Sequence, residues 1–232
     1  MRSARAAGVA LVMGTIAAGM AQPLPALACG DFYAEERPPP KPKPKPTPDE
    51  AISVAEPAML KEQPGVAAGA LSDGFPQLKT MGMDASRQQL KALRTMAIAL
   101  ARVDGALATP GPFYAASAKA RAANLEWSIA TLRKINETRP NDPVLQAGLG
   151  EALAHVPAQQ DEAIRVLGAL ADRDVMGSAH AYAQLSRLRA IKGDVAGSRE
   201  ASRRCQAMAT SPALCPAAPA DAAPKAVAQT GA

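Results

Sequence analysis

The sequence predicts an all-α protein: a short α-solenoid of about three helical hairpins, flanked by disordered N-terminal and C-terminal segments. Its main basis is an internal repeat, because a stretch of about 83 residues, Ser128 to Thr210, repeats with a period of 35. The units align through Ser128, Ala163 and Ser198, through Leu132, Leu167 and Ser202, and through Ile135, Leu170 and Cys205. A period in the 30s is typical of helical hairpins that bury their apolar faces only against neighbouring hairpins.

The first two helices are predicted at about 86–103 and 113–137. Ser86 and Gln89 form a capping-box pattern, and large apolar residues follow at helical spacing as far as Val103. Residues 109–112, Thr-Pro-Gly-Pro, end this helix because proline and glycine disfavour continued helical backbone. One stripe of the second helix carries its large apolar residues, Leu125, Ile129, Leu132 and Ile135.

Two further hairpins complete the folded part, which we expect to span residues 86–215. A proline-rich break at 139–143 ends the long second helix. The next helices are expected at about 143–155 and 160–173, and the last pair at about 178–192 and 195–209. About 130 residues are enough for one domain with a continuous core.

These hairpins resemble the tetratricopeptide repeat (TPR) family, whose unit is a helix–turn–helix of roughly 34 residues. The middle unit matches the family pattern at Leu149, Gly150, Leu153, Ala163 and Leu167, and the last unit at Tyr182, Leu185, Ser186, Gly193, Asp194 and Ser198. The first unit departs from it, because its loop around 109–112 is roughly ten residues longer than the turn in a repeat of that length. The resemblance implies a right-handed superhelix whose first helices line a concave groove for peptides or helices.

The resemblance also implies which side chains face that groove. Carrying over the family's positions gives Glu151 and His155 from the middle unit, and His180 and Arg187 from the last. We interpret these four as polar contacts to a partner, sensitive to pH because histidine titrates near neutrality. The alternative is that they are ordinary solvated residues on helix surfaces. No lysine and asparagine set matches the carboxylate-clamp version of the family.

The N-terminus has the pattern of a secretory signal peptide over residues 1–28. Arg2 and Arg5 precede an uncharged apolar run at 6–21, and residues 26–28, Ala-Leu-Ala, form a cleavage triplet. The apolar run is shorter than the roughly 20 residues that span a bilayer. We therefore expect an exported bacterial protein in the periplasm or cell envelope. Cys29 follows the triplet directly, so ordinary cleavage and lipidation of Cys29, with a lipid anchor in the membrane, both stay open.

The segments on either side of the repeats are expected to lack a core. Residues 29–85 are predicted to be mostly disordered spacer and linker, with one short helix near 49–54. Within them, 37–48 reads RPPPKPKPKPTP, which favours extended polyproline II. Residues 216–232 are rich in alanine and proline and lack large apolar residues, so we expect a disordered tail.

Cys205 and Cys215 are predicted to form a disulfide. Cys205 occupies an inward register position on the last helix, and Cys215 follows the turn at 211–212. A bridge would fold the exit segment over the apolar face of a helix that has no following repeat. The alternatives are free thiols or pairing with Cys29; if Cys29 carries lipid, the other two remain as an even pair.

Charge and motifs exclude several classes of function. The formal net charge is +5, but Arg2 and Arg5 supply two positive charges and the lysines at 41–45 supply three, which leaves none for the rest. Nucleic-acid binding is therefore not expected. No nucleophile–base pair or phosphate loop is visible, and the spacing of His155, His180 and a cysteine fits no usual zinc site. We expect neither an enzyme nor a cofactor or metal.

Two functions agree with these patterns. The first is an exported adaptor that binds a protein or peptide partner of unknown identity in its helical groove. The second is a structural spacer protein, tethered to membrane or wall through Cys29 or the Lys-Pro segment, that acts by self-association.

Overall fold

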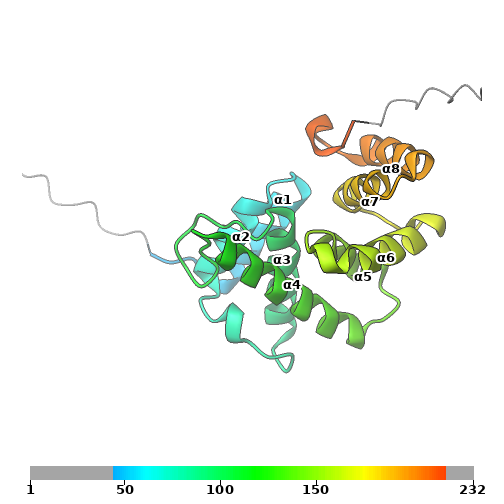
Figure 1. Cartoon of the computed structure of the whole chain (residues 1–232). Coiled ribbons are helices and arrows are strands. Elements are labelled where there is room, and N and C mark those ends of the chain that lie inside the picture. Colours follow the sequence, from blue (N-terminus) through cyan, green and yellow to red (C-terminus); the bar gives the residue numbers. More distant parts are fainter. Residues whose placement is uncertain (1–43, 218–232) are drawn as a thin grey trace, which may run out of the picture. The chain divides into compact units, whose positions relative to one another are not determined.

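The structure is a computed structural model that describes residues 44–217. The signal-peptide pattern at 1–28, Cys29 and the tail from residue 218 lie outside these residues. Within the described range the chain forms eight α-helices and three short 3-10 helices, with a single isolated β-bridge between Leu107 and Tyr114 and no strand. The all-α prediction is therefore confirmed (Figure 1).

The eight helices pair as four consecutive hairpins (Figure 1). Each first helix packs on the second helix of its own hairpin, and α3, α5 and α7 also pack on the second helix of the hairpin before them. The first helices of neighbouring hairpins also contact one another, α1 with α3, α3 with α5, and α5 with α7. The helices are α1 (Pro48–Leu60), α2 (Pro64–Gly74), α3 (Arg87–Arg102), α4 (Ala118–Thr138), α5 (Pro143–Leu153), α6 (Gln160–Asp172), α7 (Ala179–Ile191) and α8 (Val195–Met208).

Within residues 44–85, the first hairpin differs from the mostly disordered spacer and linker that the sequence predicts for 29–85. The Thr47 hydroxyl and the Glu50 carboxylate form a capping box at the start of α1. Small residues of α1 and α2 are buried in place of large ones, namely Ala51, Ala55, Ala58, Ala67 and Ala68. Gly74 permits their close approach, because a Cβ atom there would lie 2.3 Å from the Cβ of Ala51. A core built of alanines has nearly the same composition as an alanine-rich linker. The hydrophobic pattern of the sequence therefore did not reveal this hairpin.

The long connection between α3 and α4 is ordered around one buried amide. The Asn124 side chain donates hydrogen bonds to the carbonyls of Gly105 (2.9 Å) and Phe113 (2.8 Å). Gly105 has a φ of +67°, and its Cα lies against the backbone of Arg121, so a side chain does not fit there. These contacts move the start of α4 to Ala118, five residues later than the predicted position of 113.

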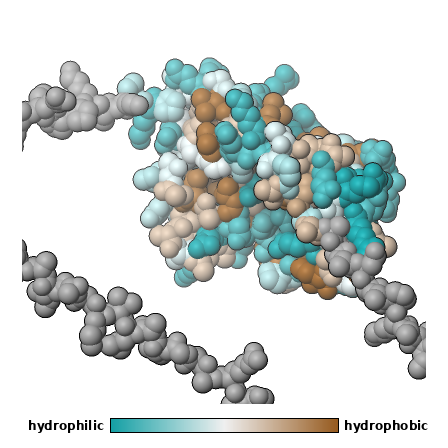
Figure 2. Space-filling view, turned by 90° about the horizontal axis from the view of Figure 1, so that it is seen from above, coloured by the Kyte–Doolittle hydropathy of each residue, from teal (hydrophilic) through white to brown (hydrophobic). Residues whose placement is uncertain are grey.

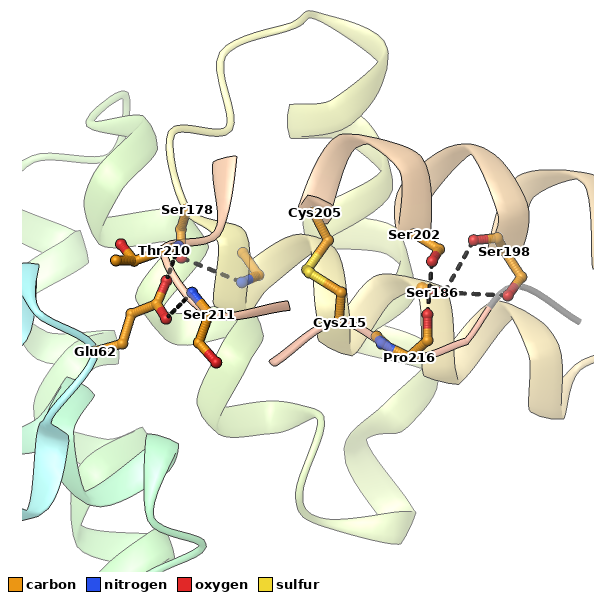
Figure 3. Close-up of a disulfide and its surroundings, with 11 residues drawn as sticks. Glu62, Ser178, Ser186, Ser198, Ser202, Cys205, Thr210, Ser211, Cys215 and Pro216 are labelled. Carbon is orange, nitrogen blue, oxygen red and sulfur yellow. Dashed lines mark hydrogen bonds between the residues drawn. A yellow bond between two sulfur atoms is a disulfide. The ribbon is translucent and has the colours of Figure 1, made fainter. Parts of the chain in front are cut away.

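The disulfide between Cys205 and Cys215 is present, as predicted (Figure 3). It draws the exit segment back over α8, where Leu214 and Cys215 pack on the apolar cluster between α6, α7 and α8. The Ser202 hydroxyl adds a hydrogen bond of 2.7 Å to the Pro216 carbonyl. The exit segment thus covers a helix face that has no following hairpin.

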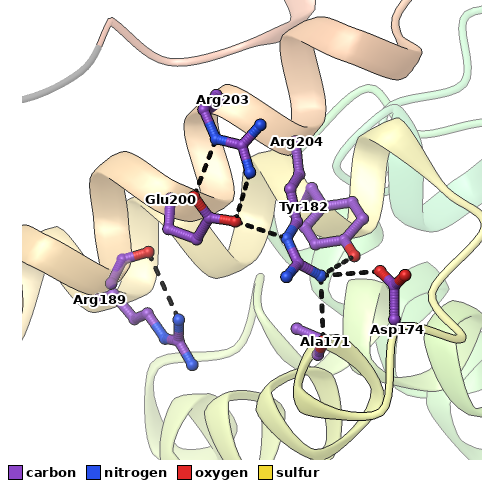
Figure 4. A network of polar contacts seen from close by, with 8 residues as sticks. Ala171, Asp174, Tyr182, Arg189, Glu200, Arg203 and Arg204 are labelled. Carbon is purple, nitrogen blue, oxygen red and sulfur yellow. Dashed lines mark hydrogen bonds and ion pairs between the residues drawn. The ribbon is translucent and has the colours of Figure 1, made fainter.

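Arg204 holds the last hairpin to the one before it (Figure 4). Its guanidinium donates to the Ala171 carbonyl, the Asp174 carboxylate and the Tyr182 hydroxyl, and to Glu200 on its own helix. Hydrogen bonds from Arg203 and Arg204 lower the pKa of Glu200 to about 2. A small pocket at this junction is lined by Tyr182, Glu200 and Arg204, whose polar groups are bonded to one another within the protein.

Candidate functional site

A cavity of about 680 Å³ lies along the first helices of the hairpins. Its walls come from α1 and α3, from the first residues of α5 and α7, and from the end of α8. The cavity therefore draws on all four hairpins. This is the side of the molecule on which the TPR resemblance implies a groove.

Exposed apolar side chains gather at this cavity. Leu60 at the end of α1 is 81% exposed, Val144 at the start of α5 is 52% exposed, and Met208 at the end of α8 is 44% exposed. All three line the cavity. Figure 2 shows hydrophobic and hydrophilic residues interspersed over one face of the molecule. Convergence of exposed apolar side chains from three hairpins marks an interaction site more strongly than single exposed residues do.

Most charged residues of the cavity are matched inside the protein. Lys91 lies 2.7 Å from the Glu56 carboxylate, and Arg102 is paired with Glu151. Arg94 is different, because within residues 44–217 it forms neither a hydrogen bond nor an ion pair. It is partly buried on α3 and lines the cavity. An arginine without a partner in a cavity can receive an anionic group.

Glu151 is not a groove contact, which corrects the first of the four predicted positions. Its side chain is 2% exposed, and its carboxylate receives two hydrogen bonds from Arg102, at 2.7 and 3.1 Å, and one from Ser178. Burial opposes ionisation of Glu151, but Arg102 and the Ser178 hydroxyl outweigh it and lower its pKa. The carboxylate instead joins α3 and α5 to the start of α7.

His155 and Arg187 are also engaged within the protein. His155 lies just past α5, with Nδ1 at 3.0 Å from the Asp104 carboxylate and Nε2 at 3.1 Å from the Gln184 amide. Arg187 donates to the Ala154 carbonyl at 3.1 Å. Burial lowers the pKa of His155 despite the nearby Asp104 carboxylate. Neither residue lines the cavity, so the structure does not bring these two predicted positions to it.

His180 is the predicted groove residue that does line the cavity. Burial, with the positive charge of Arg102 second, lowers its pKa to about 4. Its Nε2 atom is buried and has no hydrogen-bond partner in the described part of the chain. The imidazole is therefore expected to be neutral near pH 7, so its titration would fall below the near-neutral range expected from the sequence.

A hydrogen-bonded contact closes one side of the cavity. The Glu62 carboxylate, in the turn after α1, accepts the backbone N–H groups of Thr210 (2.8 Å) and Ser211 (3.0 Å) (Figure 3). Both Glu62 and Thr210 line the cavity. Glu62 has a φ of +57°, a conformation that costs energy for a residue other than glycine. We call Glu62, Thr210 and Ser211 the clasp.

Several residues that line the cavity carry no signal in the sequence that predicts a site. Leu60 and Glu62 fall in a segment predicted to be linker, and Arg94 lies on α3, for which no groove position was carried over. No local signal identifies them, since their common feature is proximity after folding. Among residues 44–217, no three histidine, cysteine, aspartate or glutamate side chains form a cluster suited to a metal ion. Nor is any helix in that range long and apolar enough to cross a bilayer.

Comparisons with protein-family models, curated proteins and solved structures find no match to this chain. The TPR resemblance, and with it the superhelical arrangement, therefore stays a prediction from the sequence.

Proposed function

We propose that this protein is an exported, TPR-like adaptor that binds a peptide segment of a partner protein in the cavity along its first helices. The observation that carries the proposal is the convergence of Leu60, Val144 and Met208 from three hairpins on one cavity. When a partner covers exposed apolar side chains of this kind, their removal from water makes binding more favourable. Stacked helical hairpins commonly use such surfaces for binding proteins.

The size of the cavity suits a short segment. About 680 Å³ falls within the range of roughly 300–1,000 Å³ typical of ligand sites. It can accept a few side chains and not a whole domain. The adaptor would thus recognise a local feature of its partner.

Two features support the exported location. The signal-peptide pattern at 1–28 predicts translocation. The disulfide between Cys205 and Cys215 suits an oxidising compartment such as the periplasm. The second function predicted from the sequence, a tethered spacer, depends on Cys29 and the Lys-Pro segment, and none of the contacts described above adds to it.

The test is selection of peptides from a random display library on protein purified after expression from its full sequence. The variant Leu60→Asp should lower the affinity for the selected peptides at least tenfold, because burying one leucine side chain contributes about 1.5–3 kcal/mol to binding. Ile191→Asp is the matched control, since Ile191 also ends the first helix of a hairpin and is 62% exposed, but lies outside the cavity. Equal binding by both variants, or no enrichment of any peptide, would overturn the proposal.

A further inference from the structure

We infer that the cavity recognises a peptide segment in which an acidic side chain is flanked by aliphatic ones, with Arg94 as the partner of the carboxylate. This inference rests on the proposed function as a peptide-binding adaptor. It adds the chemistry of the peptide and names the residue that selects it.

The charges of the cavity favour an anion at Arg94. The Lys91 ammonium is compensated by Glu56, and the Arg102 guanidinium by the buried Glu151. The Glu62 carboxylate is satisfied by the two N–H groups of the clasp. Arg94 is left as the cavity cation that no other residue of 44–217 matches. Complementarity then calls for one negative charge on the occupant.

Apolar side chains lie near Arg94 in the cavity, both on α3 and on other helices. Lys91, Arg94, Ile98 and Arg102 recur at intervals of three or four residues, so they share one face of the helix, and all line the cavity. Ile98 thus follows Arg94 by one turn, or about 5.4 Å. Across the cavity, Leu60 and Met208 offer exposed apolar surface. An occupant that satisfies both features carries aliphatic side chains next to its carboxylate.

A carboxylate fits this site better than a phosphate group does. Phosphopeptide sites use clusters of arginines to balance a charge of nearly −2. Among the described residues that line the cavity, Arg94 supplies one unmatched guanidinium, and its planar fork suits one carboxylate through two parallel hydrogen bonds. The imidazole of His180, the other titratable group facing this space besides those already paired, is neutral near pH 7 and adds no positive charge.

The experiment extends the library selection with internal peptides whose C-terminus is blocked, so that side chains supply every carboxylate. Peptides selected on the unaltered protein should be enriched in Asp or Glu between aliphatic residues. In fluorescence anisotropy, replacing that acidic residue by its amide should weaken binding at least tenfold. The variant Arg94→Gln should abolish this difference, binding acid and amide peptides equally.

Arg139→Gln is the matched control, because Arg139 is an exposed arginine outside the cavity and should leave the preference intact. Circular dichroism melting should show the same Tm for both variants, since neither side chain is bonded within the described residues.

The outcomes separate the inference from the proposed function. Selected peptides that depend on Leu60 but carry no acidic residue, or whose preference survives Arg94→Gln, overturn the inference and leave peptide binding in place. Peptides that bind only with a free C-terminus assign the carboxylate to a chain end and also overturn it. No Leu60-dependent enrichment at all removes the proposed function and the inference together.

Discussion

The Glu62 carboxylate accepts the backbone N–H of Thr210 at 2.8 Å, although 148 residues separate the two along the chain. With the adjacent N–H of Ser211 at 3.0 Å, this contact ties the turn after the first helix to the exit of the last. Both ends of the described chain thereby meet at the border of one cavity. The contact consists of one side chain and two exposed backbone N–H groups. Because water can replace these hydrogen bonds, the clasp can open without unfolding the helices.

Removing the Glu62 carboxylate should open the clasp without unfolding the protein. We expect Glu62→Gln to speed amide hydrogen exchange at Thr210 and Ser211 at least fivefold, because a hydrogen bond to a charged group is stronger than one to a neutral amide. Global stability should fall by no more than about 1 kcal/mol, since the contact is exposed. Glu62→Gly should open the clasp equally but recover stability, because glycine tolerates a φ of +57°. Glu56→Gln is the control and should leave both amides protected.

Loss of the disulfide should destabilise the last hairpin. The bridge joins residues ten apart, so in the chain-entropy model it contributes ~2–3 kcal/mol. The double variant Cys205→Ser/Cys215→Ser should lower the urea midpoint accordingly and also expose Thr210 and Ser211 to exchange. An unchanged midpoint would mean that the exit segment is held by its packing and by the Ser202 hydrogen bond alone.

Breaking the buried pair between Arg102 and Glu151 should be costly. Glu151→Gln leaves a guanidinium that is only 14% exposed without its counter-charge, so we expect a loss of about 3 kcal/mol in urea unfolding. The surface pair between Arg133 and Glu162 provides the control, and Glu162→Gln should cost less than about 1 kcal/mol. A similar small loss for both variants would contradict the structural role assigned to Glu151.

The depressed pKa of His180 predicts a pH dependence of stability. The unfolded chain binds a proton at His180 near pH 6.5, whereas the folded protein does so only near pH 4. Between these values the unfolded state binds more protons, so stability falls as the pH drops from about 6.5 to about 4. His155, whose pKa is also lowered, adds to this loss. The carboxylates of Glu151 and Glu200 affect stability at lower pH. Because their pKa values are lowered in the folded protein, they stabilise it above about pH 4.5, and this stabilisation is lost as the pH falls further.

Nuclear magnetic resonance separates these groups directly. The imidazole Cε1 proton of His180 should titrate with a midpoint near 4 in the folded protein. In urea unfolding, His180→Gln should lose less stability between pH 7 and pH 5 than the unaltered protein loses. A His180 midpoint near 6.5 would show that the ring is solvated and the assignment wrong.

The helices after residue 86 and the disulfide could be predicted from sequence because their signals are local. Ser86 with Gln89 marks a helix start whatever the rest of the chain does, and that capping box is present. The position of Cys205 in the repeat placed its side chain inward, and it is fully buried. α1 also begins with a capping box, at Thr47 and Glu50. Its Ala-rich sequence and that of α2 have no stripe of large apolar residues, because their burial depends on contacts with α3 that form only on folding.

The sequence by itself determined the helical character, the period and the residues that cap and cross-link the chain, since these follow from backbone preference and spacing. Tertiary structure alone decided which side chains meet. The TPR resemblance implied Glu151 at the groove, but Arg102, 49 residues earlier, holds its carboxylate inside the protein. Leu60, Arg94, Val144 and Met208 share a cavity only because four hairpins pack side by side. Contacts between residues that are far apart in the chain are not signalled by the residues around them. These contacts therefore decide which side chains of the repeats reach a common surface.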